Sequence, residues 1–457
     1  MSNSMLALVG VFLPGMSMLL AGDAARTDAA ARPNIVMIIS DDQAWTDYGF
    51  MQHPHIRTPN LDRLAASSAV FPRGHVPTAL CRPSLATLVS GRYAHQHLIT
   101  GNDPSPSLAD PGSPQYAELR HRLIGRLDRW ETLPRALTRL GYRSFQSGKW
   151  WEGSYQRGGF SHGMTRGFPE PNGRHGDAGL MIGREGMAPI LQFIDQSISE
   201  QAPFFVWYAP FLPHTPHNPP EELLSRYRSA VPSLHVARYF AMCEWFDTTC
   251  GALLDGLQQR GVADRTIVVY LADNGWIQDP DSGKFAPRSK QSPYEGGVRQ
   301  PIMIRWPDVI RPGSYDSLVS SVDIFPTLLS ALGADAPADL PGIDLMPVMR
   351  DGARLERDTI YGEAFAHDIA DLDRPQASLL YRWAIEGNWK LILTYDGQLG
   401  RYAEIHDRSD PRPQLFDLQS DPQERTNLAS RQPQIVARLA RKIAAWWDAG
   451  ERRTVEE

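Results

Sequence analysis

Two strongly apolar segments of the sequence end in polar residues that could bind a metal ion. Residues 34–40 and 266–272 are continuous runs rich in β-branched side chains, which is typical of strands buried on both faces of a parallel sheet. The residues that follow these two runs are Asp41, Asp42, Asp273 and Asn274. Ligands of such sheets bind beyond the carboxyl ends of the strands, and three carboxylates with one amide offer only oxygen. Oxygen ligands suit a hard divalent cation, either Ca²⁺ or Mg²⁺.

Each acidic pair taken alone would more simply cap a helix or form a turn. Packing gives no reason, however, to place two such pairs at two buried strand ends. Two further apolar runs, residues 203–208 and 142–147, lead to His214 in a proline-rich loop and to Lys149. The carboxyl ends of four predicted strands therefore carry groups that could act on one ligand.

Cys81 precedes a predicted helix over residues 83–89. Pro83 suits the first position of a helix and Gly91 suits its C-terminal stop. The free N–H groups at a helix N-terminus stabilise negative charge on a nucleophile. A lone cysteine is more often a buried core residue, which is the competing interpretation. A cysteine-phosphatase site is excluded, because the arginine it needs six residues after the cysteine is Thr87 here.

The elements that must position these residues alternate between strands and helices. Helical patterns cover residues 61–66, 83–89, 133–140, 187–199 and 236–259, and a fifth apolar run covers residues 301–305. This alternation predicts an α/β domain with a large, mostly parallel central sheet flanked by helices. We expect it to span residues 32–350.

A smaller C-terminal α+β domain is predicted over residues 351–457. It would be built on a short antiparallel sheet with strands at residues 379–386, 390–394 and 414–417. A helix is predicted at residues 433–449, in which Trp446 and Trp447 would be packing residues.

Composition excludes several classes of protein. The chain has 457 residues with 42% hydrophobic and 21% charged residues, enough apolar material for a full core. Its net charge of −6 argues against general nucleic-acid binding. Three cysteines are too few for a disulfide-stapled scaffold.

Residues 1–25 have the pattern of a signal peptide. An apolar run at residues 6–20 precedes a small-residue stretch, and the run is short for a membrane span and contains Pro14. This predicts a periplasmic or secreted protein without a membrane span in its mature form. No Lys or Arg precedes the run, so a mis-assigned start codon or a non-exported protein with a ragged N-terminus are the alternatives.

The segment around Cys81 resembles the signature of the formylglycine-dependent sulfatases, a family of the alkaline-phosphatase superfamily. The signature Cys-x-Pro-Ser-Arg, followed by Leu-Thr-Gly-Arg, stands here as Cys-Arg-Pro-Ser-Leu at residues 81–85 and Leu-Val-Ser-Gly-Arg at residues 88–92. Other segments match the family in order: RPNIVMIISDD, TPNLDRLAASSAVF, PHTPH, LADNG, SKQSPYEGGVRQPIMIRWP, WKLI and LFDLQSDPQERTNLA. The resemblance therefore extends over almost the whole chain.

The resemblance implies hydrolysis of a sulfate ester, on a sulfated small molecule or more specifically a sulfated carbohydrate. A formylglycine-generating or equivalent maturation enzyme would oxidise Cys81 to formylglycine, whose hydrate attacks sulfur to form a covalent sulfo-enzyme. Lys149, His214 and Lys290 would contact the sulfate, with His214 as the general acid. Arg92 would support the hydrate. The Ca²⁺ ligands would be Asp41, Asp42, Asp273 and Asn274.

Two residues depart from the family pattern. Leu85 replaces the signature arginine, and Trp151 replaces the histidine of the usual Gly-Lys-Trp-His. Trp151 could instead provide a flat floor for a sugar ring. A glycine-rich insert supplies residues that could compensate: His162, Arg166, Arg174 and His175.

The departures leave two alternatives open. The same site could hydrolyse a phosphodiester or a phosphonate monoester, because the transferred group differs little in size. The protein could also be a catalytically impaired, glycan-binding homologue of the sulfatases.

Overall fold

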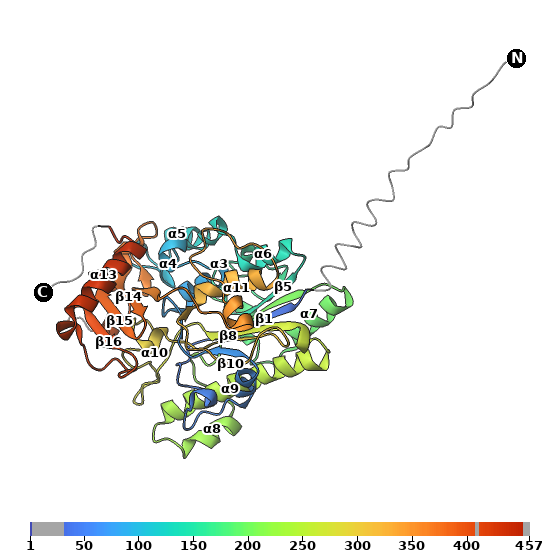
Figure 1. Cartoon of the computed structure of the whole chain (residues 1–457), viewed down its shortest axis with the longest axis horizontal. Coiled ribbons are helices and arrows are strands. Elements are labelled where there is room, and N and C mark those ends of the chain that lie inside the picture. The colour runs from blue at the N-terminus through green and yellow to red at the C-terminus, as the bar shows by residue number, and fades with distance from the viewer. Residues whose placement is uncertain (2–31, 407–410, 451–457) are drawn as a thin grey trace.

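Four strands, three of them wholly apolar or nearly so, pair in parallel at the centre of an eight-stranded sheet. The computed structural model of the chain describes residue 1, residues 32–406 and residues 411–450. The central order is β8 (Thr266–Ala272), β1 (Asn34–Ser40), β7 (Phe204–Ala209) and β5 (Arg143–Gly148) (Figure 1). Every residue of β1, β7 and β8 is buried, which explains why their sequences show no alternation of polar and apolar residues. The predicted α/β fold with a mostly parallel sheet is confirmed.

The edges of this sheet are mixed in direction. β9 (Ile302–Arg305) runs antiparallel to both β8 and β2 (Ala69–Phe71), while β10 (Gly313–Ser314) and β6 (His162–Gly163) add short parallel strands. The fifth apolar run is therefore a buried strand of the opposite direction. An apolar run does not reveal the direction of its strand, because burial on both faces selects the same residues in parallel and antiparallel strands.

Helices cover both faces of the central sheet. Alternate residues of β1 serve two cores, with Ile35 and Met37 on one face and Val36 and Ile38 on the other. The first core contains α3 (Cys81–Ser90), α6 (Leu133–Arg139) and α11 (Ile324–Ala331). The second contains α2 (Pro59–Ala66), α7 (Ala188–Ser199) and α9 (Leu234–Gln259). The remaining helices are α4 (Ala94–His97), α5 (Pro114–Ile124), α8 (Glu221–Arg228), α10 (Glu295–Val298) and α12 (Met346–Asp351).

A separate antiparallel sheet forms the smaller C-terminal part of the fold. Its order is β12 (Thr359–Phe365), β14 (Leu379–Glu386), β15 (Trp389–Thr394) and β16 (Gln414–Asp417). The three predicted strands are confirmed, and β12 is an addition. Two pairs of two-residue strands complete the fold: β4 (Asp103–Pro104) with β13 (Asp368–Ile369), and β3 (Gly74–His75) with β11 (Val319–Ser320).

Helix α13 (Pro433–Trp446) packs against this sheet and ends three residues before the predicted position. Trp446 stacks on Tyr361 of β12 with ring centroids 5.2 Å apart, and Trp447 stacks on His95 at 4.5 Å. Both tryptophans are packing residues, as predicted.

Helix α3 begins at Cys81, two residues earlier than predicted. Leu80 is the N-cap residue, and the Ser84 N–H donates to its carbonyl at 3.0 Å. Pro83 is tolerated at the third position because the first N–H groups of a helix have no partner within it. Gly91, with a left-handed φ of 68°, ends the helix as predicted. Cys81 thus belongs to the first turn of the helix.

The predicted signal peptide lies outside the described residues except for residue 1. Within the described part of the chain, no helix combines the length and the apolar character needed to cross a membrane.

Candidate active site

The structure brings the polar residues that follow β1 and β8 together. The backbone N–H of Asp42 donates to Asp273 Oδ1 at 3.1 Å, and Asn274 Nδ2 donates to Asp42 Oδ1 at 2.7 Å. Asp42 adopts a left-handed φ of 67°, which is strained for a residue other than glycine. The strain accompanies the packing of both acidic pairs into one cluster at the carboxyl edge of the sheet.

Three oxygen atoms of this cluster are buried without a hydrogen-bond donor. They are Asp41 Oδ2, Asp273 Oδ2 and Asn274 Oδ1. Leaving a buried acceptor unsatisfied costs about 1–3 kcal/mol each, so three such acceptors on neighbouring strand ends favour a positive partner. Oxygen donors of this kind suit a hard divalent cation. The residues present therefore fit the metal site that the sequence predicts.

Cys81 and His214 lie close to two of the predicted metal-binding aspartates. One ligand atom from each of Asp41, Asp42, Cys81 and His214 lies within 4.8 Å of the others. The nucleophile position and the acidic cluster thus share one small volume.

Burial acts differently on the three carboxyl groups. It raises the pKa of Asp41 well above the ordinary value and also raises that of Asp273. Burial opposes ionisation of Asp42 too, but the neighbouring Lys290 outweighs it and lowers the pKa of Asp42. A cation beside Asp41 and Asp273 would favour their charged forms.

Two buried lysines pair with the cluster. Lys149 Nζ lies 2.7 Å from Asp41 Oδ1, and Lys290 Nζ lies 2.6 Å from Asp42. Burial alone would lower the pKa of each lysine, but the facing aspartates raise both, so the lysines are charged. Each lysine can direct its remaining N–H groups toward a bound anion.

The chain positions Lys149 through a glycine at the end of β5. Gly148 has a φ of 79°, and a Cβ atom there would lie 1.8 Å from the carbonyl oxygen of Ala209. The N–H of Lys149 donates to that same carbonyl at 2.7 Å. Only glycine permits this approach of β5 to β7, so it fixes where the lysine points.

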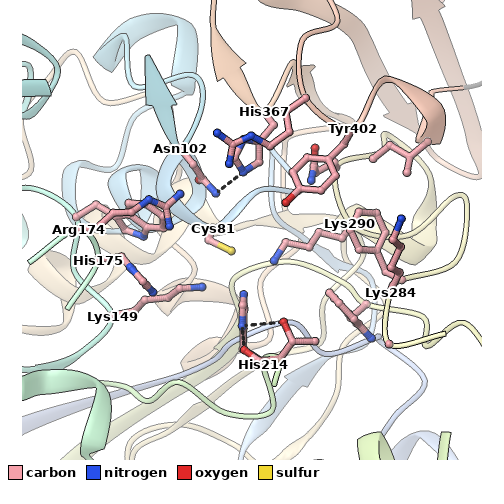
Figure 2. Close-up of a pocket in the computed structure, with 18 of the residues that line it drawn as sticks. Cys81, Asn102, Lys149, Arg174, His175, His214, Lys284, Lys290, His367 and Tyr402 are labelled. Carbon is pink, nitrogen blue, oxygen red and sulfur yellow. Dashed lines mark hydrogen bonds between the residues drawn. The ribbon is translucent and has the colours of Figure 1, made fainter. Parts of the chain in front are cut away.

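Cys81 points into the space between the two lysines (Figure 2). Its sulfur lies 3.9 Å from Asp41 Oδ1 and 4.0 Å from Asp42 Oδ1. Burial raises the pKa of the Cys81 thiol to about 12, although Lys149 opposes the shift. At neutral pH the unmodified side chain is therefore a neutral thiol.

His214 approaches the same space from the loop after β7. Its Nδ1 lies 2.6 Å from the carbonyl oxygen of Thr215 and donates to it, and its Nε2 lies 3.4 Å from Asp42 Oδ2. Burial, followed by Lys149, lowers the pKa of His214 well below neutrality. The ring of the free protein is therefore uncharged. It can donate a proton to a leaving group only if a bound anion raises its pKa.

Cys81, Lys149, His214 and Lys290 form the floor of a cavity of about 350 Å³. Its wall includes residues that the sequence analysis missed: Asn102, Trp276, Lys284, Phe285, Gln291, His367, Arg401, Tyr402 and Glu404. His367, Arg401 and Tyr402 follow β12 in the chain and lie above the floor. Trp276, two residues after Asn274, and Gln291, directly after Lys290, had a nearby sequence signal.

The glycine-rich insert contributes two of its four candidate residues. Arg174 and His175 line the cavity, whereas His162 contacts Arg143 and Ser161, and Arg166 is 68% exposed beside Glu170.

Trp151 also lines the cavity but offers little open surface. Its side chain is 4% exposed, since the guanidinium of Arg174 lies 4.6 Å from the ring centroid and the ring of His175 lies 5.0 Å away. The expected stacking floor for a sugar is therefore covered. Trp151 instead holds Arg174 and His175 in place.

The structure does not bring Arg92 into the cavity. Arg92 follows the C-terminal end of α3, where it pairs with Asp339 at 2.6 Å and lies over Trp130 at 4.2 Å. Leu85 packs in the first core. Cys81 belongs to the same core, one helical turn before Leu85. The contacts of Arg92 hold the C-terminal end of α3, and its expected support of the hydrate stays a prediction.

A buried arginine that the sequence analysis did not use stands beside Cys81. This residue, Arg82, makes a bidentate contact with Glu152. Its Nε and Nη2 atoms each donate to one carboxylate oxygen at 2.7 Å. Arg82 Nη1 also donates to the carbonyl of Asn102 at 3.0 Å. This pair locks the first turn of α3 to the cavity wall.

Comparison with known proteins identifies the family of this chain. The sulfatase family model matches residues 33–334, so the chain belongs to the sulfatase family, whose members are sulfuric ester hydrolases. A second model, N-sulphoglucosamine sulphohydrolase, C-terminal, matches residues 283–447.

Known proteins are similar over nearly the whole chain. The N-acetylgalactosamine-6-sulfatase of Mus musculus is 28% identical, over 90% of this chain and 84% of its own. The PsFucS1 sulfatase from Pseudoalteromonas sp. has a TM-score of 0.69 at 18% identity, covering 97% of each chain. The phosphonate monoester hydrolase of Agrobacterium radiobacter has a TM-score of 0.66 at 20% identity, covering 93% of this chain and 97% of its own. The fold alone therefore does not distinguish sulfuryl from phosphonyl transfer.

Proposed function

We propose that this sulfatase hydrolyses a sulfate ester on a carbohydrate, with a formylglycine derived from Cys81 as its nucleophile. The observation that carries the proposal is the position of Cys81. Its sulfur lies within 4.0 Å of two aspartates at the floor of a cavity, between the charged ends of Lys149 and Lys290. A nucleophile placed there meets the sulfate where positive charge is concentrated.

The proposed metal is Ca²⁺, with Mg²⁺ as the alternative. Asp41, Asp42, Asp273 and Asn274 would hold it, because they follow two neighbouring strands and three of them have a buried oxygen without a hydrogen-bond donor. When bound, the cation would neutralise charge on the sulfate and lower the pKa of the attacking hydroxyl.

The protein's own side chains would orient the ester and stabilise its negative charge. Lys149 and Lys290 would each donate to a sulfate oxygen at the floor of the cavity. Negative charge of the bound ester would raise the pKa of His214, whose Nε2 faces the cavity, so that it could carry a proton to the leaving oxygen.

A sulfated carbohydrate is the proposed substrate class. The matched relative is named for N-acetylgalactosamine 6-sulfate, and the C-terminal model is named for N-sulphoglucosamine. A cavity of about 350 Å³ is large enough for a sulfated monosaccharide. Export through residues 1–25 to the periplasm or the medium, and conversion of Cys81 by a maturation enzyme, complete the proposal.

Two measurements test the proposal. Peptide mass spectrometry across residue 81 should show the mass of formylglycine in place of cysteine. The Cys81→Ala variant should lose hydrolysis of 4-nitrophenyl sulfate while keeping the parent's melting temperature. If this variant hydrolyses the ester as fast as the parent, the covalent mechanism is wrong and a water molecule must be the attacker.

The shared fold makes the phosphonate alternative worth a parallel assay. We expect a higher kcat/KM for 4-nitrophenyl sulfate than for a 4-nitrophenyl phosphonate monoester; the reverse order would favour the alternative. Binding of sulfated sugars without turnover of either ester would instead indicate a catalytically impaired homologue.

A further inference from the structure

Two arginines on the cavity wall are connected through a pair of neighbouring aspartates. Asp103 of β4 and Asp368 of β13 are partners in the register of a short parallel pair. Arg174 Nε donates to Asp103 at 3.1 Å, and Arg401 Nε lies 3.4 Å from Asp368. Because the two strands are adjacent, both guanidinium groups are anchored on the same part of the wall.

This wall carries excess positive charge. Arg120 also approaches Asp103, at 3.7 Å, so three guanidinium groups face two carboxylates. The aspartates are buried, and Arg174 keeps the pKa of Asp103 low against the effect of burial. Three guanidinium groups outnumber two carboxyl groups, so the cluster has a net charge of at least about +1.

Of these arginines, Arg401 has the most N–H donors available to bind a ligand. Its side chain is 46% exposed and makes one contact with Asp368 near the limit for an ion pair. A guanidinium has five N–H donors, so most of them can reach a ligand. Arg174 is partly exposed as well and is held by its contact with the Trp151 ring.

The proposed chemistry does not use this charge. Lys149 and Lys290 are already paired with Asp41 and Asp42 at the floor. Lys284 adds a further exposed cation on the opposite side of the opening (Figure 2). Among the described residues that line the cavity, Glu404 is the single carboxylate. A substrate with one sulfate would leave the wall charge unmatched.

We propose that Arg174 and Arg401 form a subsite for a second anionic group of the saccharide whose sulfate ester reaches Cys81. The group is an oxyanion with planar or tetrahedral oxygens, either a uronate carboxylate or a second sulfate, which guanidinium groups bind through paired N–H donors. The inference rests on the proposed function and narrows it. The preferred substrate class is a saccharide with at least two acidic groups.

A matched series of substrates tests the subsite. N-acetylgalactosamine 6-sulfate has one anionic group, its 4,6-disulfate has two sulfates, and its disaccharide with glucuronate adds a carboxylate. We expect Arg401→Ala to lower kcat/KM about tenfold, mainly through KM, for whichever two-anion substrate the subsite binds. Activity on the single-anion substrate and on 4-nitrophenyl sulfate should stay within about twofold of the parent. The control is Arg374→Ala, which removes an exposed arginine paired with Asp371 away from the cavity.

The outcomes separate the subsite from the proposed function. Equal losses on all substrates, or no loss on either two-anion substrate, would overturn the subsite even if the parent is an active sulfatase. Loss on the disulfate alone would assign a second sulfate, and loss on the disaccharide alone would assign a carboxylate. Calorimetric titration of the disulfate and the disaccharide into Cys81→Ala, with and without Arg401→Ala, measures the subsite without turnover. A weaker affinity in the double variant supports the subsite even if no ester is hydrolysed, whereas equal affinities overturn it.

Discussion

The ion pair between Arg82 and Glu152, next to Cys81, is buried, and its burial determines how much stability its loss should cost. The side chains of Arg82 and Glu152 are 1% and 4% exposed and make two contacts of 2.7 Å. Removing one partner leaves the other charge buried and unpaired, which costs about 3–5 kcal/mol. A chain of this size unfolds with an entropy of about 0.9 kcal/mol/K. Arg82→Met or Glu152→Leu should therefore lower the melting temperature by about 3–6 °C.

The double variant distinguishes pairing from simple loss of packing. With both charges removed, the apolar replacements fill much of the same space, so we expect it to lie closer to the parent than either single variant. Thermal unfolding followed by circular dichroism measures all four proteins of the cycle. The control is Arg228→Met, which breaks an exposed ion pair with Glu221 and should cost about 0.5 kcal/mol or less. Additive losses, or single losses no larger than the control, would show that the pair does not act as a buried unit.

Three further predictions concern a glycine, a buried acid and the metal ligands. Gly148→Ala should displace Lys149 and reduce kcat/KM more than tenfold, whereas Gly387→Ala, with a similar φ and open surroundings, should leave activity unchanged. Burial raises the pKa of Asp47 from 3.8 to about 7, so the folded state binds more protons and stability falls as pH rises from about 4 to about 7. Asp47→Asn should reduce this pH dependence of the free energy of unfolding, measured by urea denaturation. An unchanged slope of that free energy against pH would contradict the raised pKa of Asp47. Asp273→Ala should abolish the melting-temperature difference between calcium and chelator, while Asp264→Ala at the other end of β8 should retain it.

The floor of the site could be predicted from the sequence because local rules place it. A buried strand is visible as an apolar run, and its carboxyl end is the residue where the run stops. That rule located Asp41, Asp273 and Lys149 before any tertiary contact was known. The predicted start of α3 was two residues too late for a different reason. Proline is allowed at several positions of the first helical turn, so Pro83 does not fix where the helix begins.

The wall of the site could not be predicted, because its residues meet through long-range contacts without a local pattern. Asn102 and His367 are 265 positions apart and are joined by a side-chain contact of 3.2 Å and by the N–H of Asn102 donating to the carbonyl of His367 at 2.9 Å. The strands that bring them together, β4 and β13, have two residues each. Two residues carry no periodicity that a sequence can reveal.

This division between floor and wall bears on how the protein selects its substrate. Several groups proposed to act on the sulfate or to hold the cation, Lys149, Asp41 and Asp273, follow central strands, whose burial allows few substitutions. Arg174 comes from an insert and Arg401 from a loop beside the second sheet, where exposed side chains can change at little cost. Substitution of the wall residues should therefore alter which saccharide is bound without altering the chemistry at residue 81. The proposed second-anion subsite is located in the part of the cavity where such selectivity can arise independently of the reacting groups.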